Sequence, residues 1–100
     1  MRNLEWQSDA WCDYLELQKY DKVLLKKVNN LIKDIVRNGY QCKEGKLEML
    51  KGELSGYASV RIDKKNRLIF KDSEGRITIF ACGNHYSDRG YRKISVNLKS

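Results

Sequence analysis

The chain has no proline, a single histidine and no long apolar run. A membrane-spanning helix needs about 20 consecutive apolar residues, and no segment here approaches that length. The N-terminus also lacks the basic-then-apolar pattern of a signal peptide. Cys12, Cys42 and Cys82 are odd in number and widely spaced, which argues for reduced thiols rather than a disulfide framework. Together these absences predict a small cytoplasmic protein with no membrane partner.

The chain also lacks a low-complexity linker and internal repeats, so its 100 residues predict one domain with a modest core. Its positive charge is unevenly spread. Residues 1–50 carry nine Lys/Arg against eight Asp/Glu, whereas residues 51–100 carry eleven against five. This asymmetry favours a face that meets a polyanion such as nucleic acid. Charge that serves only solubility would give the same pI of 9.4, so the alternative stays open.

The first half of the chain predicts a short strand followed by two helices. Residues 3–7 alternate polar and apolar side chains, which is typical of a strand. Ser8 is the expected N-cap of a helix that reaches about Tyr20, with one face marked by Trp11, Tyr14, Leu15 and Gln18. Asp21 is expected to cap a second helix, which Asn38 and Gly39 end. Its apolar face is predicted to hold Leu24, Val28, Leu31, Ile32 and Ile35.

Three strands are expected in the second half, over residues 57–63, 67–72 and 76–82, with the second turn at 73–75. In the first turn, a three-residue loop over 64–66 would leave Asn66 left-handed, Asp63 opposite Arg67 and Arg61 opposite Ile69. Only an odd-length loop places both arginines on one face, with the apolar residues on the other. The fold class predicted is α+β: a helical hairpin on one face of a mostly antiparallel sheet, with the active face opposite.

A polar set in this half has the parts needed to cleave RNA through its own 2′-hydroxyl without a metal or cofactor. Glu48, between Lys46 and Lys51, is the natural base, and His85 is the natural acid because imidazole titrates near neutral pH. Arg67, with Arg61 behind it, would hold phosphate oxygens. Lys46 and Lys51 would add positive charge to the pocket, and Tyr86 could stack on a base or orient the phosphate.

Each of these residues also has a simpler interpretation. Glu48 could be an ordinary loop carboxylate, and the arginines could be solvated or paired with acids such as Asp63. His85 could be a surface or core polar residue, and Tyr86 could close the sheet edge. Cys82 and His85 stand at a C-x-x-H spacing, but structural zinc normally uses paired ligand knuckles. A small strand residue explains Cys82 better than a metal site does.

The sequence resembles the YoeB/Txe branch of the RelE-like toxins. The resemblance lies in GKLEMLKGELSGYASVRIDKKNRLIF (residues 45–70) and ITIFACGNHY (residues 77–86), with Trp6, Trp11 and the LIKDI run at 31–35 in support. It implies a RelE-like toxin domain over residues 1–86 and a ribosome-dependent mRNA endonuclease. It also implies that the partners are a cognate antitoxin, the ribosome with its rRNA, and mRNA. A monomer and a homodimer both remain open.

The chain departs from the family pattern at several positions. Leu47 and Met49 stand where prolines usually flank the glutamate, so the loop that aims Glu48 is expected to be less rigid. Ala58 replaces the usual tryptophan, and Val60, expected to point into the core, replaces an arginine. Residues 87–100 form a C-terminal extension of unknown role.

Two other functions compete with the nuclease. One is a non-catalytic toxin on the same fold, resembling the ParE gyrase poisons, which needs neither a base nor an acid. The other is a basic RNA-binding module without catalysis, whose binding would depend steeply on salt. The pair Glu48 and His85 distinguishes a nuclease from these two alternatives, because neither alternative needs a base and an acid.

Overall fold

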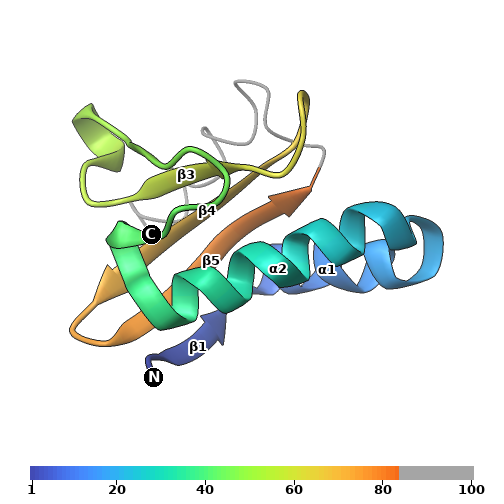
Figure 1. The fold of residues 1–100 in the computed structure, drawn as a ribbon, viewed down its shortest axis with the longest axis horizontal. Helices are drawn as coiled ribbons and strands as arrows, with labels where there is room; N and C mark the ends of the chain where they lie inside the picture. Colours follow the sequence, from blue (N-terminus) through green and yellow to red (C-terminus); the bar gives the residue numbers. More distant parts are fainter. Residues whose placement is uncertain (84–100) are drawn as a thin grey trace.

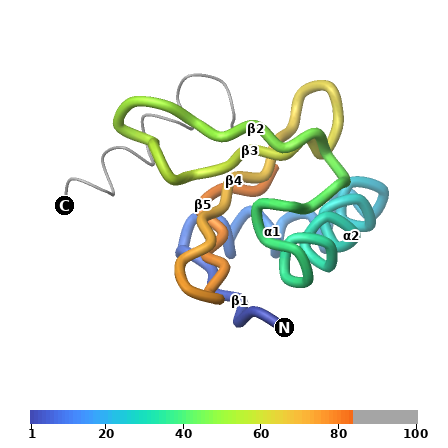
Figure 2. The backbone as a smooth tube through the Cα atoms, turned by 60° about the vertical axis from the view of Figure 1, so that its left-hand side comes forward, coloured from blue at the N-terminus to red at the C-terminus, as the bar shows by residue number. Residues whose placement is uncertain are grey.

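The computed structural model describes residues 1–83, which form a five-stranded sheet with two helices on one face (Figure 1). The elements in chain order are β1 (Asn3–Trp6), α1 (Ser8–Tyr20), α2 (Lys22–Asn38), β2 (Glu48–Met49), β3 (Ala58–Arg61), β4 (Arg67–Ser73) and β5 (Arg76–Gly83), with single 3-10 turns at Gly39–Gln41 and Gly52–Leu54. The strand order is β1-β5-β4-β3-β2, which Figure 2 follows from bottom to top. Only β1 is parallel to its neighbour. The predicted α+β class and mostly antiparallel sheet are therefore confirmed.

Helix α2 forms as its sequence pattern predicts. The Asp21 carboxylate accepts a hydrogen bond from the backbone N–H of Leu24 at 3.0 Å, which satisfies a free donor in the first turn. The buried side chains lie on one stripe of the helix and comprise Leu24, Val28, Leu31 and Ile35. Gly39 ends the helix with a φ of 58°, and a Cβ there would collide with the Asp72 carboxylate. No helix within residues 1–83 is long and apolar enough to cross a membrane.

Helix α1 differs from its prediction in its first residue and in its buried face. The N-cap is Gln7 rather than Ser8, because Gln7 N–H still donates to the β5 carbonyl of Ile79 at 2.9 Å. The helix buries Ala10 and Leu17, with Tyr14 partly buried between them. Trp11 and Leu15, expected on the buried face, are 43% and 37% exposed.

The exposed position of Trp11 has a local cause. Its ring packs against Trp6 with centroids 5.6 Å apart and stacks on Tyr14 at 5.8 Å. These three rings form an aromatic cluster at the border of the main core, against which Trp6 and Tyr14 pack, and Gln18 is exposed. The predicted face of α1 was therefore wrong at Trp11, Leu15 and Gln18, because Trp11 contacts the other two rings and remains partly exposed.

The sheet has a large apolar face under the helices and a small apolar cluster on the other side. Val60, Leu68, Phe70, Ile77 and Ile79 are fully buried against the helices, and each such side chain contributes about 1.5–3 kcal/mol by leaving water. The opposite face holds a second cluster of Leu54, Tyr57, Ile69 and Ala81. Val60 points into the core, as predicted.

In the β3–β4 hairpin the side chains lie on the predicted faces of the sheet, but the pairing register differs from the prediction. Arg61 pairs with Arg67 and Ser59 with Ile69, so the loop is five residues long, from 62 to 66. Asp63 does not face Arg67, because its carboxylate accepts from the backbone N–H groups of Lys65 and Asn66 at 2.8 and 2.7 Å. Asn66 is not left-handed. Because side chains alternate with a period of two, a register shift of two residues leaves each side chain on the same face of the sheet. Both arginines therefore still share one face.

The β4–β5 hairpin closes through Glu74 and Gly75, whose φ values of 53° and 83° suit a two-residue turn. Further along, Ile79 pairs with Phe70 but Ala81 pairs with Ile69, so Phe80 is an extra residue in β5. This β-bulge places Phe80 beside Tyr57, with ring centroids 4.6 Å apart. Cys82 stays fully buried in the core beneath the helices.

Candidate functional site

Glu48 reaches the sheet through a short edge strand that the sequence did not predict. Gly45 and Lys46 have φ values of 80° and 50°, and this left-handed pair turns the chain into β2. Glu48 then pairs with Ser59 of β3, and the backbone N–H of Leu50 donates to the carbonyl of Tyr57 at 2.9 Å. Glu48 therefore lies on the sheet face opposite the helices, which is the predicted active face.

Glu48 and Arg67 meet on this face. An Arg67 Nη1 atom lies 3.9 Å from Glu48 Oε2 and donates to the hydroxyl oxygen of Ser59 at 3.4 Å. The Arg67 side chain is 28% exposed, whereas that of Glu48 is 68% exposed. A solvated carboxylate thus stands beside a cation that Ser59, itself fully buried, supports from beneath.

The other predicted cations surround this pair less closely. Arg61 is the Cα partner of Arg67 in the ladder and is exposed. Lys46 precedes Glu48 by two residues, Lys51 follows it by three, and both are exposed. Within residues 1–83 neither lysine forms an ion pair, so their charges add to the local potential without fixing the Glu48 carboxylate.

His85 and Tyr86 lie outside the described residues, so their predicted roles stay predictions. The last described residue is Gly83 at the end of β5, and it is paired with Arg67. It precedes His85 by two positions in the sequence. The backbone of β5 therefore ends next to the arginine that contacts Glu48.

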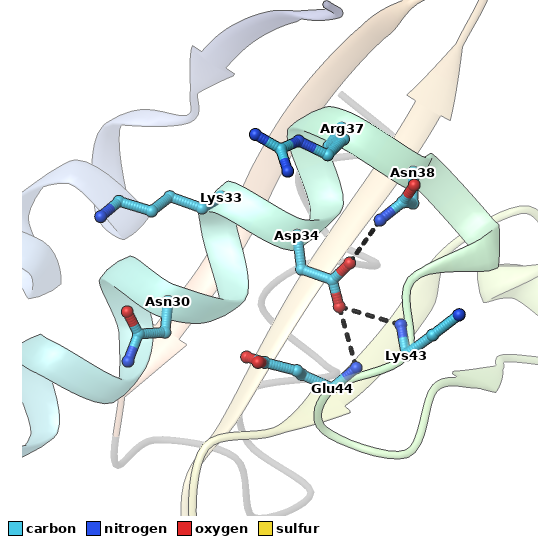
Figure 3. Close-up of a pocket in the computed structure, with 7 residues that line it drawn as sticks. All are labelled: Asn30, Lys33, Asp34, Arg37, Asn38, Lys43 and Glu44. Atoms are coloured by element: carbon cyan, nitrogen blue, oxygen red, sulfur yellow. Dashed lines mark hydrogen bonds between the residues drawn. The ribbon is translucent and has the colours of Figure 1, made fainter.

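The loop that leads to Glu48 is fixed by a carboxylate of α2 (Figure 3). Asp34 Oδ2 accepts from the backbone N–H groups of Lys43 and Glu44 at 2.9 and 2.8 Å, and Oδ1 accepts from Asn38 Nδ2 at 2.6 Å. Partial burial acts to raise the pKa of Asp34, but these hydrogen bonds outweigh it. The pKa consequently lies below its ordinary value of 3.8.

The far end of the same segment is held by Tyr40. Its hydroxyl donates to the carbonyl of Gly56 at 2.6 Å and accepts from the backbone N–H of Asp72 at 2.9 Å. Its ring stacks on Phe70 with centroids 5.7 Å apart. The segment from 43 to 56, which contains Glu48, is thus attached at both ends to residues at or just beyond the C-terminal part of α2.

Two hollows lie where α2 approaches this segment. The larger, of about 410 Å³, is lined by Asn30, Lys33, Asp34, Arg37, Asn38, Lys43 and Glu44. The smaller, of about 200 Å³, is lined by Lys27, Asn30, Leu31, Glu44, Gly45, Arg61 and Ile62. Neither is lined by Glu48 or Arg67.

Sequence reasoning missed two residues of this arrangement. It gave Ser59 no role, although the Ser59 hydroxyl contacts Arg67. It assigned Asp34 only to a structural helix. No sequence signal marked Asp34, because its partners are backbone N–H groups nine and ten residues further along the chain.

Chemically, the described residues place an exposed hydrogen-bond acceptor, the Glu48 carboxylate, next to the partly exposed guanidinium of Arg67. Such a pair can accept a proton and contact an anion at adjacent points. The small apolar cluster containing Tyr57 and Ile69 adjoins it on the same face. Lys71 covers the Tyr57 ring, with its Nζ 5.4 Å from the centroid.

A family model and the relatives at about 40% identity place the chain in one family. The family model described as the YoeB-like toxin of bacterial type II toxin–antitoxin systems matches residues 6–86. Toxin YoeB of Escherichia coli strain K12 is 43% identical over 83 residues, covering 83% of this chain and 98% of that protein.

Two solved structures from Staphylococcus aureus extend the likeness to the fold. The heterotetrameric YoeB–YefM toxin–antitoxin complex contains a chain that is 40% identical, with a TM-score of 0.79 over 86% of this chain and 99% of that one. The YoeB dimer is also 40% identical, with a TM-score of 0.77 over 85% and 98%. The chain therefore belongs to the family of YoeB-like toxins of bacterial type II toxin–antitoxin systems.

Proposed function

We propose that this protein is a ribosome-dependent mRNA endonuclease, the toxin of a type II toxin–antitoxin pair. The observation that carries the proposal is the pairing of Glu48 with Arg67 on the sheet face opposite the helices of a YoeB-like toxin. The activity requires that the protein work in the cytoplasm, where bacterial ribosomes translate. It needs no metal or cofactor, because the proton transfers and the charge stabilisation are assigned to side chains.

In the proposed reaction the Glu48 carboxylate takes the proton of an RNA 2′-hydroxyl. The 2′-oxygen attacks the adjacent phosphorus, and the bond from phosphorus to the 5′-oxygen breaks. His85, as imidazolium, gives its proton to the leaving 5′-oxygen. The products are a 2′,3′-cyclic phosphate, or its 3′-phosphate hydrolysis product, and a 5′-hydroxyl. Each such proton transfer typically contributes about 10²–10⁴-fold to the rate.

Arg67 is assigned to the phosphate oxygens, with Arg61, Lys46 and Lys51 adding positive charge and Tyr86 stacking on a base. In the free protein Arg67 instead contacts Glu48, at 3.9 Å, so binding of a phosphate would require Arg67 to exchange one partner for another. An exposed ion pair of this kind contributes only about 0–1 kcal/mol. A phosphate can therefore draw the guanidinium away from Glu48 at little cost and leave the carboxylate free to accept a proton.

A cognate antitoxin is the proposed protein partner. The Staphylococcus aureus relative was solved in complex with YefM, and the positive charge of this chain favours an acidic segment that covers the basic face. The same relative was also solved as a dimer, so a homodimer is the second assembly to test by measuring the mass of the free toxin in solution.

The test is to map mRNA ends by primer extension after inducing the wild type, Glu48→Gln and His85→Gln. The wild type should produce new cuts inside translated reading frames, and both variants should lose them strongly. Glu16→Gln is the matched control, because Glu16 is exposed on α1, away from the site, and it should cut as the wild type does.

Full toxicity in Glu48→Gln or His85→Gln would refute the role assigned to that residue. Arrest of growth with intact mRNA and damaged DNA would favour the gyrase-poison alternative. RNA binding with steep salt dependence, but without cyclic or 3′-phosphate ends, would favour the binding-module alternative.

A further inference from the structure

We propose that Asp34 is a positioning residue for the cleavage reaction, an inference that rests on the proposed function. It holds the loop that delivers Glu48 to the sheet face. Asp34 itself does not lie on that face. Its effect would be transmitted through the backbone of residues 43–47.

Asp34 has a fixed place on α2. It lies on α2 between Leu31 and Ile35, both buried under the sheet. Its two carboxylate oxygens take three hydrogen bonds, one from Asn38 on the same helix and two from the loop N–H groups of Lys43 and Glu44. Figure 3 shows the carboxylate pointing from the helix towards these two groups.

The loop is also attached to β3 just after Glu44. The next residue, Gly45, accepts from the backbone N–H of Arg61 at 2.7 Å. It also fits so closely that an added Cβ would lie 2.9 Å from Leu31 Cδ2 and 3.0 Å from Val60 Cβ. Asp34 and Arg61 therefore hold the backbone on both sides of Glu44, one from the helix and one from the strand.

Strand β2 is only two residues long and is held mainly through its neighbours. It consists of Glu48 and Met49 at the sheet edge, and both residues are exposed. Leu47 and Leu50, on either side, pack against the two apolar clusters. Leu47 and Met49, rather than prolines, flank the carboxylate, so the backbone is not restricted by its own chemistry. The register that pairs Glu48 with Ser59 therefore depends on the anchors before and after the strand.

Removal of the Asp34 carboxylate should lower the cleavage rate without weakening binding to the ribosome–mRNA complex. In Asp34→Ala the N–H groups of Lys43 and Glu44 lose their acceptor, and the loop can move. A misplacement of about 1 Å in a catalytic group can cost roughly 10²-fold in rate. We expect a loss of about 10- to 100-fold in the single-turnover cleavage rate at saturating ribosome–mRNA complex, with the half-saturating concentration unchanged.

Asp34→Asn is the conservative variant. Its amide oxygen can still accept from both loop N–H groups while its NH₂ donates to a reoriented Asn38 side chain. We expect this variant to retain most of the wild-type cleavage rate. If Asp34→Asn retains the cleavage rate and Asp34→Ala does not, the effect comes from attachment of the loop rather than from the negative charge.

Tyr14→Phe is the matched control for a purely structural role. It removes the 2.6 Å hydrogen bond from Tyr14 to Asn29, which joins the two helices away from the 43–48 loop. It should lower stability while the folded protein cleaves at the wild-type rate. In Asp34→Ala, amide exchange at residues 43 and 44 should accelerate, and in Tyr14→Phe it should not.

The inference is overturned if folded Asp34→Ala cleaves within about twofold of the wild type, or if its whole loss lies in ribosome binding. It is also overturned if Tyr14→Phe loses as much cleavage as Asp34→Ala. A wild type that leaves ribosome-bound mRNA intact would instead refute the proposed function itself, and this inference with it.

Discussion

Replacing Tyr40 with phenylalanine isolates one hydroxyl that joins three parts of the chain. The ring and its stacking on Phe70 stay, while the carbonyl of Gly56 and the N–H of Asp72 each lose their partner. The cost of leaving part-buried polar groups unpaired is about 1–3 kcal/mol in the free energy of unfolding. For a domain of this size, each kcal/mol lowers the Tm by about 4–8 °C.

Urea unfolding followed by tryptophan fluorescence measures this cost, since Trp6 and Trp11 pack together in the aromatic cluster. Tyr20→Phe is the control: Tyr20 is 82% exposed, and surface changes of this kind usually stay within about 0.5 kcal/mol. A Tyr40→Phe protein no less stable than Tyr20→Phe would show that water replaces the hydroxyl. The reasoning that the segment containing Glu48 is fixed at its far end would then fail.

Two further predictions concern titratable groups. Hydrogen bonds outweigh partial burial and hold the pKa values of Asp34 and Asp63 below their ordinary value of 3.8, so both stabilise the fold above that pH and lose this contribution as the pH falls through the folded-state pKa. The free energy of unfolding of the wild type should thus decrease from about pH 4 to pH 2. In the double variant Asp34→Asn, Asp63→Asn the decrease should be smaller, and an equal decrease in the two proteins would contradict the prediction. An aromatic disulfide reagent at pH 8 should label only exposed Cys12 in the native protein, because burial raises the pKa of Cys42 to about 11 and that of Cys82 to about 12. All three thiols should react in denaturant, and rapid labelling of native Cys42 would contradict the prediction.

Local signals predicted α2 well, because its apolar spacing, its Asp21 cap and its Gly39 end agree with one another. The predicted buried face of α1 was wrong at Trp11 and Leu15, which are exposed, although Tyr14 does pack against the core. Here Trp11 packs on Trp6, a residue of the neighbouring strand. The hairpin register was wrong by two because the Asp63 carboxylate builds its own turn, which strand alternation alone does not reveal.

The sequence allowed the residues of the candidate site to be predicted, but not the strand and the contacts that position them. Alternation placed Arg61 and Arg67 on one face, and the register of β3 with β4 confirms it. That Glu48 sits in a strand was not predictable, because β2 has only two residues and no period to detect. The role of Asp34 depends on a contact between a helix and a loop ten residues later, which no local pattern encodes.

The extra residue in β5 lets one strand serve two apolar layers at once. In an unbroken ladder Phe80, Ala81 and Cys82 would alternate, and Cys82 would turn away from the helices towards Arg67. Because two successive residues, Phe80 and Ala81, face the same way, Tyr57 gains an aromatic neighbour while Cys82 remains in the helix-covered layer. Shortening the strand by Phe80 would therefore keep the inward and outward pattern of its end but remove the ring that covers Tyr57.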